Sequence, residues 1–375
     1  MESRSYVVRL LASDKLRAWL NLSHCHFDSM HIYFTNGMIG QELGYWWTAI
    51  QKQTNVTMQD VQSYVNAGWN ISTARGGLTL AQLRACFNEK LLKKDADYRG
   101  DADQTMAAFP LLVQFQEEIL RGHVDGLDKE FDSLLALSAV VHKLQKCKRA
   151  GDSVEGLLQL QEKHLCAFQK AYDKTKTRPK QHYSLHLEEQ ARMWSGRILD
   201  TFTPERKHRV FKSQVAQLQT NLNTFSKSTL LQLGEQELRN IGNPHDLTST
   251  LGRSKPIDQW LVDHVQKILC QPLEVSLHMT NEKGMTFTAK QFLILSRIMA
   301  VEILCCARAG DDMHLVVHVL QRATKTDQPR NPAASIWFKT NDKIRVLPMK
   351  TLQSQDVFLF RHQKVDQNLQ FTFIA

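Results

Sequence analysis

Residues 17–31 read RAWLNLSHCHFDSMH, and this stretch decides how the front of the chain is expected to fold. Its first part, Arg17 to His26, is short, alternating and rich in aromatic residues, which is typical of a β-strand. Asp28 then sits in an acidic turn, and apolar residues recur at helical spacing from Ile32 to about Gln53. The pattern predicts a strand, an acidic turn and a helix.

The composition bounds the class of protein. The 375 residues carry a formal net charge of +9, with 42% hydrophobic and 8% aromatic residues, which is ordinary for a folded globular chain. We expect no membrane partner, because no run approaches the roughly 18 apolar residues of a membrane-spanning helix. The N-terminus lacks a basic region followed by an apolar run, so we expect a nuclear or cytoplasmic protein, not a secreted one.

Cysteine usage and nucleotide motifs narrow the class further. Seven cysteines without a C-x-x-C pair favour reduced thiols over a disulfide framework or a cysteine-rich zinc site. The sequence contains neither a phosphate-binding loop motif nor a dinucleotide fingerprint, so we expect no nucleotide cofactor.

Most of the excess positive charge lies in residues 143–180, which hold ten Lys and Arg against four acids. A basic surface of this kind favours polyanions, because each neutralised phosphate releases condensed counterions. The candidate nucleic-acid contacts at the end of this stretch are Lys174, Lys176, Arg178 and Lys180. A solvated helix surface is the alternative interpretation.

The middle and the rear of the chain differ in pattern. Helical periodicity predicts three long helices, from Thr105 to Gly122, from Asp125 to Cys147 and from Ser153 to Tyr172. After about residue 273, short strand-like runs separated by turns predict a small, mostly antiparallel β domain. The fold class expected is therefore α+β.

Two acidic residues stand out by position. Asp28 follows the expected strand, and Glu205 lies in the first turn of a later helix that Thr203 caps. Both positions also have ordinary structural uses, since an Asp after a strand caps a helix and a Glu in the first turn complements the helix dipole. His182 and His186 have the spacing of a zinc pair, but no third ligand accompanies them.

Three short blocks carry a resemblance to a known family. FDSMH at residues 27–31, with Asn36-Gly37 and Glu42 downstream, resembles the signature of the second catalytic Asp in CACTA-type (En/Spm-like) DDE transposases. RPKQHYSLHL at residues 178–187 and ERKHR at residues 205–209 are similar to the later block of that family. There a helix-borne Glu follows an all-helical insertion. The resemblance spans roughly residues 23–212.

The resemblance implies an RNase H-like fold in which three carboxylates hold two divalent metal ions. Asp28 would take the position of the second carboxylate and Glu205 that of the third, with Mg²⁺ or Mn²⁺ as the cofactor. The side chains beside this Glu would grip phosphates on either side of the reacting bond: Arg206, Lys207, His208 and Arg209.

The expected domains follow from the resemblance and the patterns together. Residues 1–55 and 178–220 would form a partial RNase H-like core, interrupted by a large all-helical insertion over residues 56–177. Residues 221–272 would be a helical linker, and residues 273–375 the small β-rich domain.

The sequence departs from the family at its front. Only 27 residues precede Asp28, too few for the strands that carry the first catalytic Asp, so we expect that Asp to be absent and the core to be incomplete there. The function expected is that of a transposase-derived DNA-binding protein without complete strand-transfer activity. A non-enzymatic nucleic-acid-binding or assembly protein, and a nuclease completed by another chain, stay open as alternatives. A homo-oligomer stays open as a further partner.

Overall fold

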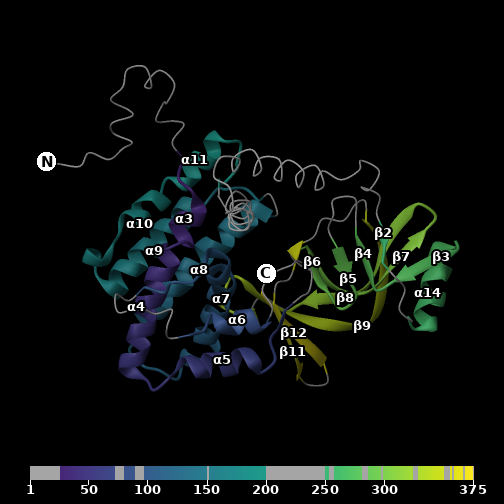
Figure 1. The fold of residues 1–375 in the computed structure, drawn as a ribbon, viewed down its shortest axis with the longest axis horizontal. Coiled ribbons are helices and arrows are strands. Elements are labelled where there is room, and N and C mark those ends of the chain that lie inside the picture. Colours follow the sequence, from purple (N-terminus) through teal and green to yellow (C-terminus); the bar gives the residue numbers. More distant parts are fainter. Residues whose placement is uncertain are drawn as a thin grey trace, which may run out of the picture.

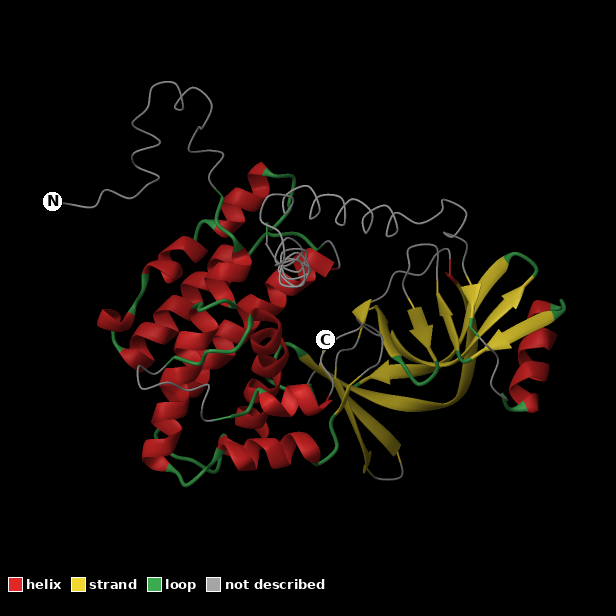
Figure 2. Ribbon diagram, viewed as in Figure 1, coloured by secondary structure: helices red, strands yellow, loops and turns green. Residues whose placement is uncertain are grey.

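The computed structural model describes residues 26–71, 80–88, 97–149, 152–199, 250–252, 257–280, 286–296, 299–323, 328–349, 355–356, 359–365 and 368–374. Helices from the front of the chain gather in one half of the molecule, and strands from the rear gather in the other (Figures 1 and 2). The α+β class and the mostly antiparallel sheet expected at the rear are confirmed.

The helical half is built from short and long helices that follow one another closely. In chain order they are α3 (Ser29–Tyr33), α4 (Met38–Gln53), α5 (Met58–Asn66), α6 (Leu80–Ala85), α7 (Ala102–Phe115), the π-helical turn η3 (Gln116–Leu120), α8 (Asp128–Arg149), α9 (Leu157–Tyr172), the 3-10 turn η4 (Lys174–Lys176), α10 (Pro179–Ser184) and α11 (Leu187–Met193). The three long helices expected in the middle of the chain correspond to α7 with η3, α8 and α9.

A turn separates α3 from α4, where the periodicity predicted one uninterrupted helix from Ile32 onward. Asn36 adopts a positive φ of 47°, which ends the first helix. At Gly37 a Cβ atom would lie 2.4 Å from the carbonyl carbon of Tyr33, so this turn requires glycine. The prediction of a continuous helix is therefore wrong. Apolar periodicity did not reveal the break, because the buried residues on both sides keep the same spacing.

Helix α4 is closely approached at Gly40 by the backbone of Tyr98. The Tyr98 amide donates to the Gly40 carbonyl at 2.8 Å, and a Cβ at Gly40 would lie 2.5 Å from the Tyr98 carbonyl oxygen. Only glycine permits this approach. The loop that contains Tyr98 is thereby fixed against α4.

A buried polar cluster joins α4, α8 and α9. Glu42 on α4 is fully buried, and its carboxylate accepts from the Ser133 hydroxyl on α8 at 2.6 Å and contacts His164 Nε2 on α9 at 2.6 Å. Gln161, one turn before His164, donates to the Tyr33 hydroxyl on α3 at 3.1 Å. Because a buried carboxylate is costly without partners, this cluster specifies how the four helices pack.

The rear of the chain forms two antiparallel sheets and one helix. The elements are β2 (Thr250–Leu251), α14 (Gln259–Leu269), β3 (Leu273–Ser276), β4 (His278–Thr280), β5 (Thr286–Thr288), β6 (Phe292–Ser296), β7 (Met299–Ala309), β8 (Asp312–Arg322), β9 (Ala334–Pro348), β10 (Gln355–Asp356), β11 (Leu359–Val365) and β12 (Asn368–Ile374). The larger sheet has the order β1-β11-β12-β9-β8-β7-β6-β10, with β3 also paired to β7, and the smaller sheet has the order β2-β4-β5.

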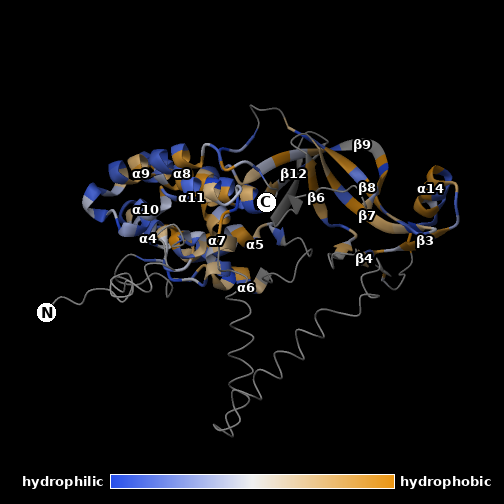
Figure 3. Cartoon of the chain, turned by 90° about the horizontal axis from the view of Figure 1, so that it is seen from above, coloured by the Kyte–Doolittle hydropathy of each residue, from blue (hydrophilic) through white to orange (hydrophobic). Residues whose placement is uncertain are grey.

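The larger sheet is covered on both faces around β7 and β8. Leu261 and Val265 of α14 pack against Cys305, Ala307 and Val316 on β7 and β8. A second apolar cluster includes Met279 of β4 and Phe287 of β5. Apolar residues accordingly run along β7, β8 and β9 in Figure 3. The near-continuous apolar sequence of β7 and β8 follows from this two-sided burial.

The two halves of the molecule are tied together at two places. Strand β1 (Asn70–Ile71) comes from the helical half and pairs with Phe360 and Leu359 of β11. Asn331, just before β9, accepts from the Ser138 hydroxyl of α8 at 3.1 Å and donates to the Pro110 carbonyl of α7 at 3.0 Å. The helices and the sheet therefore share a bonded junction.

Much of the predicted RNase H-like core lies in residues that the structure does not describe. Within the expected core the structure describes residues 26–55 and 178–199, whose regular elements are helical, while the strand expected over Arg17 to His26 lies outside the described residues apart from its last residue. The expected core, insertion and linker stay predictions. Among the described residues, no helix is long and apolar enough to cross a membrane.

Removing the buried carboxylate should test how much the polar cluster contributes. We predict that Glu42→Ala lowers the free energy of unfolding by about 3–5 kcal/mol. The buried Ser133 hydroxyl and His164 imidazole would both lose their carboxylate partner. Glu162→Ala, on the exposed side of α9, is the matched control and should change it by no more than about 0.5 kcal/mol. Urea denaturation of both variants checks this, and equal midpoints would contradict the role given to Glu42.

Candidate functional site

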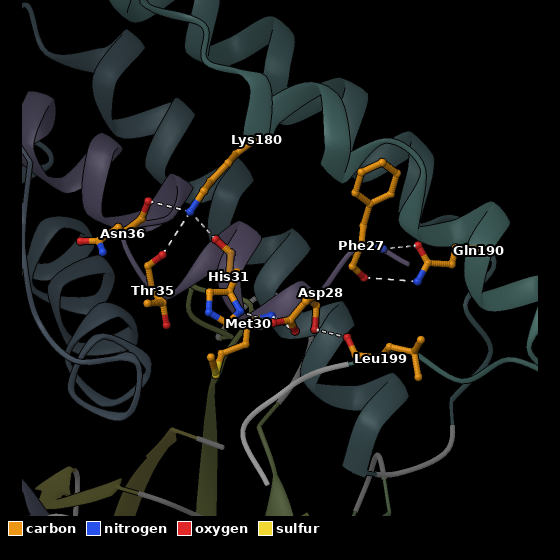
Figure 4. Close-up of polar contacts among 10 residues, drawn as sticks. Phe27, Asp28, Met30, His31, Thr35, Asn36, Lys180, Gln190 and Leu199 are labelled. Carbon is orange, nitrogen blue, oxygen red and sulfur yellow. Dashed lines mark hydrogen bonds and ion pairs between the residues drawn. The ribbon is translucent and has the colours of Figure 1, made fainter. Parts of the chain in front are cut away.

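Asp28 caps the first helix of the described chain. Its Oδ1 atom accepts from the Met30 amide at 3.0 Å, and its Oδ2 atom pairs with Nδ1 of His31 (Figure 4). The side chain is about one-fifth exposed, at 19%. The alternative interpretation of Asp28 as a helix cap is therefore confirmed, and both carboxylate oxygens have partners within α3.

Lys180 reaches from α10 to the other end of α3. Its ammonium donates to the carbonyls of His31 at 2.6 Å, Asn36 at 2.9 Å and Thr35 at 3.1 Å (Figure 4). An ammonium has three N–H donors, so all of them are used on the turn that follows α3. Burial lowers the pKa of Lys180 from its usual value. The structure thus gives this predicted nucleic-acid contact a role inside the fold.

The two neighbours of Asp28 in the sequence, Phe27 and Ser29, both bond to residues in the segment 190–199. The Phe27 amide donates to Gln190 Oε1 at 2.8 Å, and Gln190 Nε2 donates to the Phe27 carbonyl at 3.2 Å (Figure 4). The Ser29 amide and hydroxyl both donate to the Leu199 carbonyl, at 3.1 and 3.0 Å. Asp28 is therefore flanked by two bonded contacts to residues more than 160 positions away.

Aromatic rings continue this contact. The Phe27 ring stacks on Tyr183 at a centroid distance of 5.0 Å and on His186 at 5.6 Å. The neighbouring His182 and His186 lie with their Nε2 atoms 3.3 Å apart. The blocks at residues 27–31 and 178–187, which the sequence singled out separately, form one packed unit.

The remaining described basic candidates differ in how they are engaged. Arg178 donates to the Asp97 carboxylate at 3.1 Å, and this hydrogen bond raises the pKa of the guanidinium. Lys176 is exposed, with its ammonium 5.9 Å from the Tyr45 ring centroid, and Lys174 is exposed beside it on η4. All three residues are exposed, and Arg178 differs from Lys174 and Lys176 in being paired with an acid.

The acid in this segment is turned toward the backbone. Asp173 Oδ1 accepts from the Thr175 amide at 2.8 Å, and this bond lowers the pKa of the Asp173 carboxyl. Its carboxylate caps η4, and the positive charges of Lys176 and Lys174 beside it lower the pKa of Asp173 as well.

Five predicted site residues lie outside the described residues: Glu205, Arg206, Lys207, His208 and Arg209. Leu199, which bonds to Ser29, stands six positions before Glu205 in the sequence. The predicted pairing of Asp28 with Glu205 stays a prediction.

The described side chains do not complete a Mg²⁺ or Mn²⁺ site. Such ions require several oxygen ligands, whereas Asp28 offers one carboxylate whose two oxygens already have partners. Across the described ranges, no three His, Cys, Asp or Glu side chains are grouped so that they could hold a metal ion. The divalent cofactor therefore stays a prediction.

The sequence analysis missed the two later residues that bond to the neighbours of Asp28. Gln190 and Leu199 lie outside the quoted motifs, and the contact of Leu199 is made by its backbone carbonyl, which leaves no trace in residue type. Gln190 is buried on α11 among helix-forming residues. A buried Gln on the apolar face of a short helix was the one available signal.

Comparison with known proteins adds no relative. No family model matches the chain, and neither a curated protein nor a solved structure matches it.

The Lys180 contacts yield a stability prediction. We expect Lys180→Met to lower the free energy of unfolding by about 1–3 kcal/mol, because three carbonyls lose a charged donor while the aliphatic stem is kept. Lys174→Met removes an exposed ammonium and serves as the control. Urea unfolding followed by circular dichroism measures both, and a Lys180→Met midpoint equal to that of the control would show that the contacts contribute nothing.

Proposed function

We propose that this chain is a transposase-derived DNA-binding protein that does not complete strand transfer by itself. The observation that carries the proposal is the convergence of two family-like blocks, residues 27–31 and 178–187: Lys180 bonds to the His31 carbonyl, and the Phe27 ring stacks on Tyr183 and His186. Segments far apart in sequence pack together in any globular fold, and what favours the family here is that the two segments that meet are the two that resemble its blocks. Their packing around Asp28 supports the reading of the blocks as parts of one ancestral site.

The distribution of charge supports DNA as the partner. Lys163 and Lys170 are exposed on α9, and Lys174 and Lys176 are exposed on the turn that continues it. Lys163 and Lys170 stand seven positions apart, about two helical turns, so they lie on one side of α9 ahead of that turn. A row of exposed cations suits a phosphate backbone better than an isolated small anion.

The state of Asp28 supports binding over cleavage. A metal ion that activates water for phosphodiester cleavage needs open carboxylate oxygens from several elements. Both Asp28 oxygens are engaged with Met30 and His31 in the fold. A nuclease completed by another chain would have to release at least one of them.

The first experiment is the salt dependence of duplex binding by the full chain. We predict that the logarithm of affinity falls linearly with the logarithm of salt concentration. Lys174→Ala with Lys176→Ala should make this slope shallower by about 1–2, since each lost phosphate contact removes about 0.9. Fluorescence anisotropy on a labelled duplex measures the slopes.

A double variant with the same loss of charge is the control. Lys52 and Lys267 are exposed, on α4 and on α14 of the other half, and their replacement by Ala should leave the slope unchanged. Absence of duplex binding by the wild-type chain at low salt would refute the proposal. Equal slopes for the two double variants would remove η4 from the binding surface.

Plasmid nicking separates binding from catalysis. We expect the chain to leave supercoiled plasmid intact with either Mg²⁺ or Mn²⁺ present, while binding it. The opposite result has a clear signature, namely metal-dependent nicking that Asp28→Ala and Glu205→Ala each abolish. That outcome would favour the nuclease alternative. Binding without nicking is also the outcome for a non-enzymatic assembly protein with the same ancestry.

A further inference from the structure

Exposed aromatic residues gather on one side of α10 and α11. Tyr183 on α10 is 40% exposed, and Trp194, which directly follows α11, is 43% exposed. His186 and Gln190 stand between these two residues at spacings of three and four positions. The backbone between the two helices stays in the right-handed helical region, so all four residues lie along one side of this segment.

The segment before α3 completes a row of rings on this side. The Phe27 ring lies nearly parallel to the rings of Tyr183 and His186, at interplanar angles of 16° and 22°. The neighbouring His26 ring meets the Trp194 ring edge-on, at a centroid distance of 4.6 Å. These five rings form the aromatic row, which is about 16 Å long from its first to its last helical position at 1.5 Å per residue.

Hydrogen bonds of the backbone hold the row in place. Gln190 bonds to both the amide and the carbonyl of Phe27. At the other end, the amides of Trp194 and Gly196 both donate to the Ala191 carbonyl, at 3.1 and 2.8 Å. This turn ends α11 and fixes the backbone from which the indole projects. Because the row is organised in advance, a ligand that stacks on it orders little of the protein.

Internal packing explains the inner rings of the row but not its ends. Phe27, His186 and His26 are partly buried and contact the rings on either side of them. Tyr183 and Trp194 each keep about two-fifths of their surface exposed. Single exposed apolar side chains are ordinary, whereas exposed rings gathered on one surface are typical of a binding site. The two ends of the row are therefore available for a ligand.

The charge around the row favours a nucleic acid over another protein. Arg178 caps α10 about 8 Å before the row along the helix axis, and Lys174 and Lys176 precede it on η4. Arg197 is exposed three positions after the row. Residues 174–197 hold six Lys and Arg against two Glu. The core of a protein–protein interface is depleted of charge, whereas rings that follow a basic surface are how proteins bind single strands.

We propose that the aromatic row binds unpaired bases, so that this protein takes DNA in which a single-stranded segment adjoins a duplex. Bases would stack on the exposed rings of Tyr183 and Trp194, while the lysines of η4 contact phosphates of the adjoining duplex. Stacking of this kind requires no particular base, since every base has a π face. The duplex contacts are those of the proposed function, on which this inference rests.

A duplex with a short thymine tail tests the row against the same duplex with an abasic tail. The two tails carry equal numbers of phosphates, so only the bases differ. We expect the thymine tail to raise the affinity of the full chain by about 5-fold or more over the abasic tail, the contribution of one stacked base. Trp194→Leu should remove most of this gain, and Trp194→Phe, which keeps a ring, should retain it. Fluorescence anisotropy measures each affinity.

Trp260→Leu is the matched control, because it removes an indole that is 58% exposed on α14, and it should keep the gain. If the wild-type chain binds neither the tailed nor the blunt duplex, this inference and the proposed function both fail. If it binds the blunt duplex and the thymine tail adds nothing over the abasic tail, the row is overturned and the proposed function stands. A gain that Trp194→Leu keeps in full also overturns the row.

A second measurement uses the wild-type chain alone, should the variants misfold in a thermal melt. A tail that carries 5-bromouracil, irradiated in the complex, should crosslink to a peptide that contains Tyr183 or Trp194. Tail crosslinks confined to other peptides would overturn the row. Self-association that Trp194→Leu abolishes, together with no effect of the tail bases, would assign the row to a second copy of the chain and would also overturn the inference.

Discussion

The three N–H donors of the Lys180 ammonium each meet a backbone carbonyl at the end of α3, and the arrangement of the candidate site depends on this contact. The turn after α3 exposes carbonyls that have no helical partner, and an ammonium from a neighbouring helix satisfies them. The contact fixes α10 across α3. It thereby sets where Phe27 stacks and which side of Asp28 faces the later segment (Figure 4).

Buried polar groups with hydrogen-bond partners also hold the larger parts of the molecule together. Glu42 joins three helices through Ser133 and His164, and Asn331 joins the helical half to the sheet through Ser138 and Pro110. Each is a buried group that would be costly alone, so each fixes a unique arrangement of elements. The consequence for function is that the backbone that carries the exposed lysines keeps a fixed place, since Gln41 on α4 also donates to the Lys176 carbonyl at 2.7 Å. A fixed row of cations can match the regular spacing of phosphates on a duplex.

Local pattern predicted the elements far better than their contacts. Helical periodicity located α8 and α9, and strand-like runs separated by turns indicated antiparallel strands, because both patterns depend only on residues close together in the sequence. The break at Asn36 and the pairing of β1 with β11 were missed. The pairing joins residues almost three hundred positions apart and carries no local signal. For Asp28, residue type and position predicted the helix cap correctly, because a cap depends on neighbouring residues. A metal role depends on distant residues and stays a prediction.

Zero-length photocrosslinking maps the DNA-binding surface directly. A duplex carrying 5-bromouracil would be irradiated with the full-length chain, and the crosslinked peptides identified by mass spectrometry. The account predicts crosslinks in residues 143–180 and none in α14, whose exposed face carries Trp260 and Lys267. Crosslinks confined to α14, or none at concentrations where the duplex is bound, would contradict it.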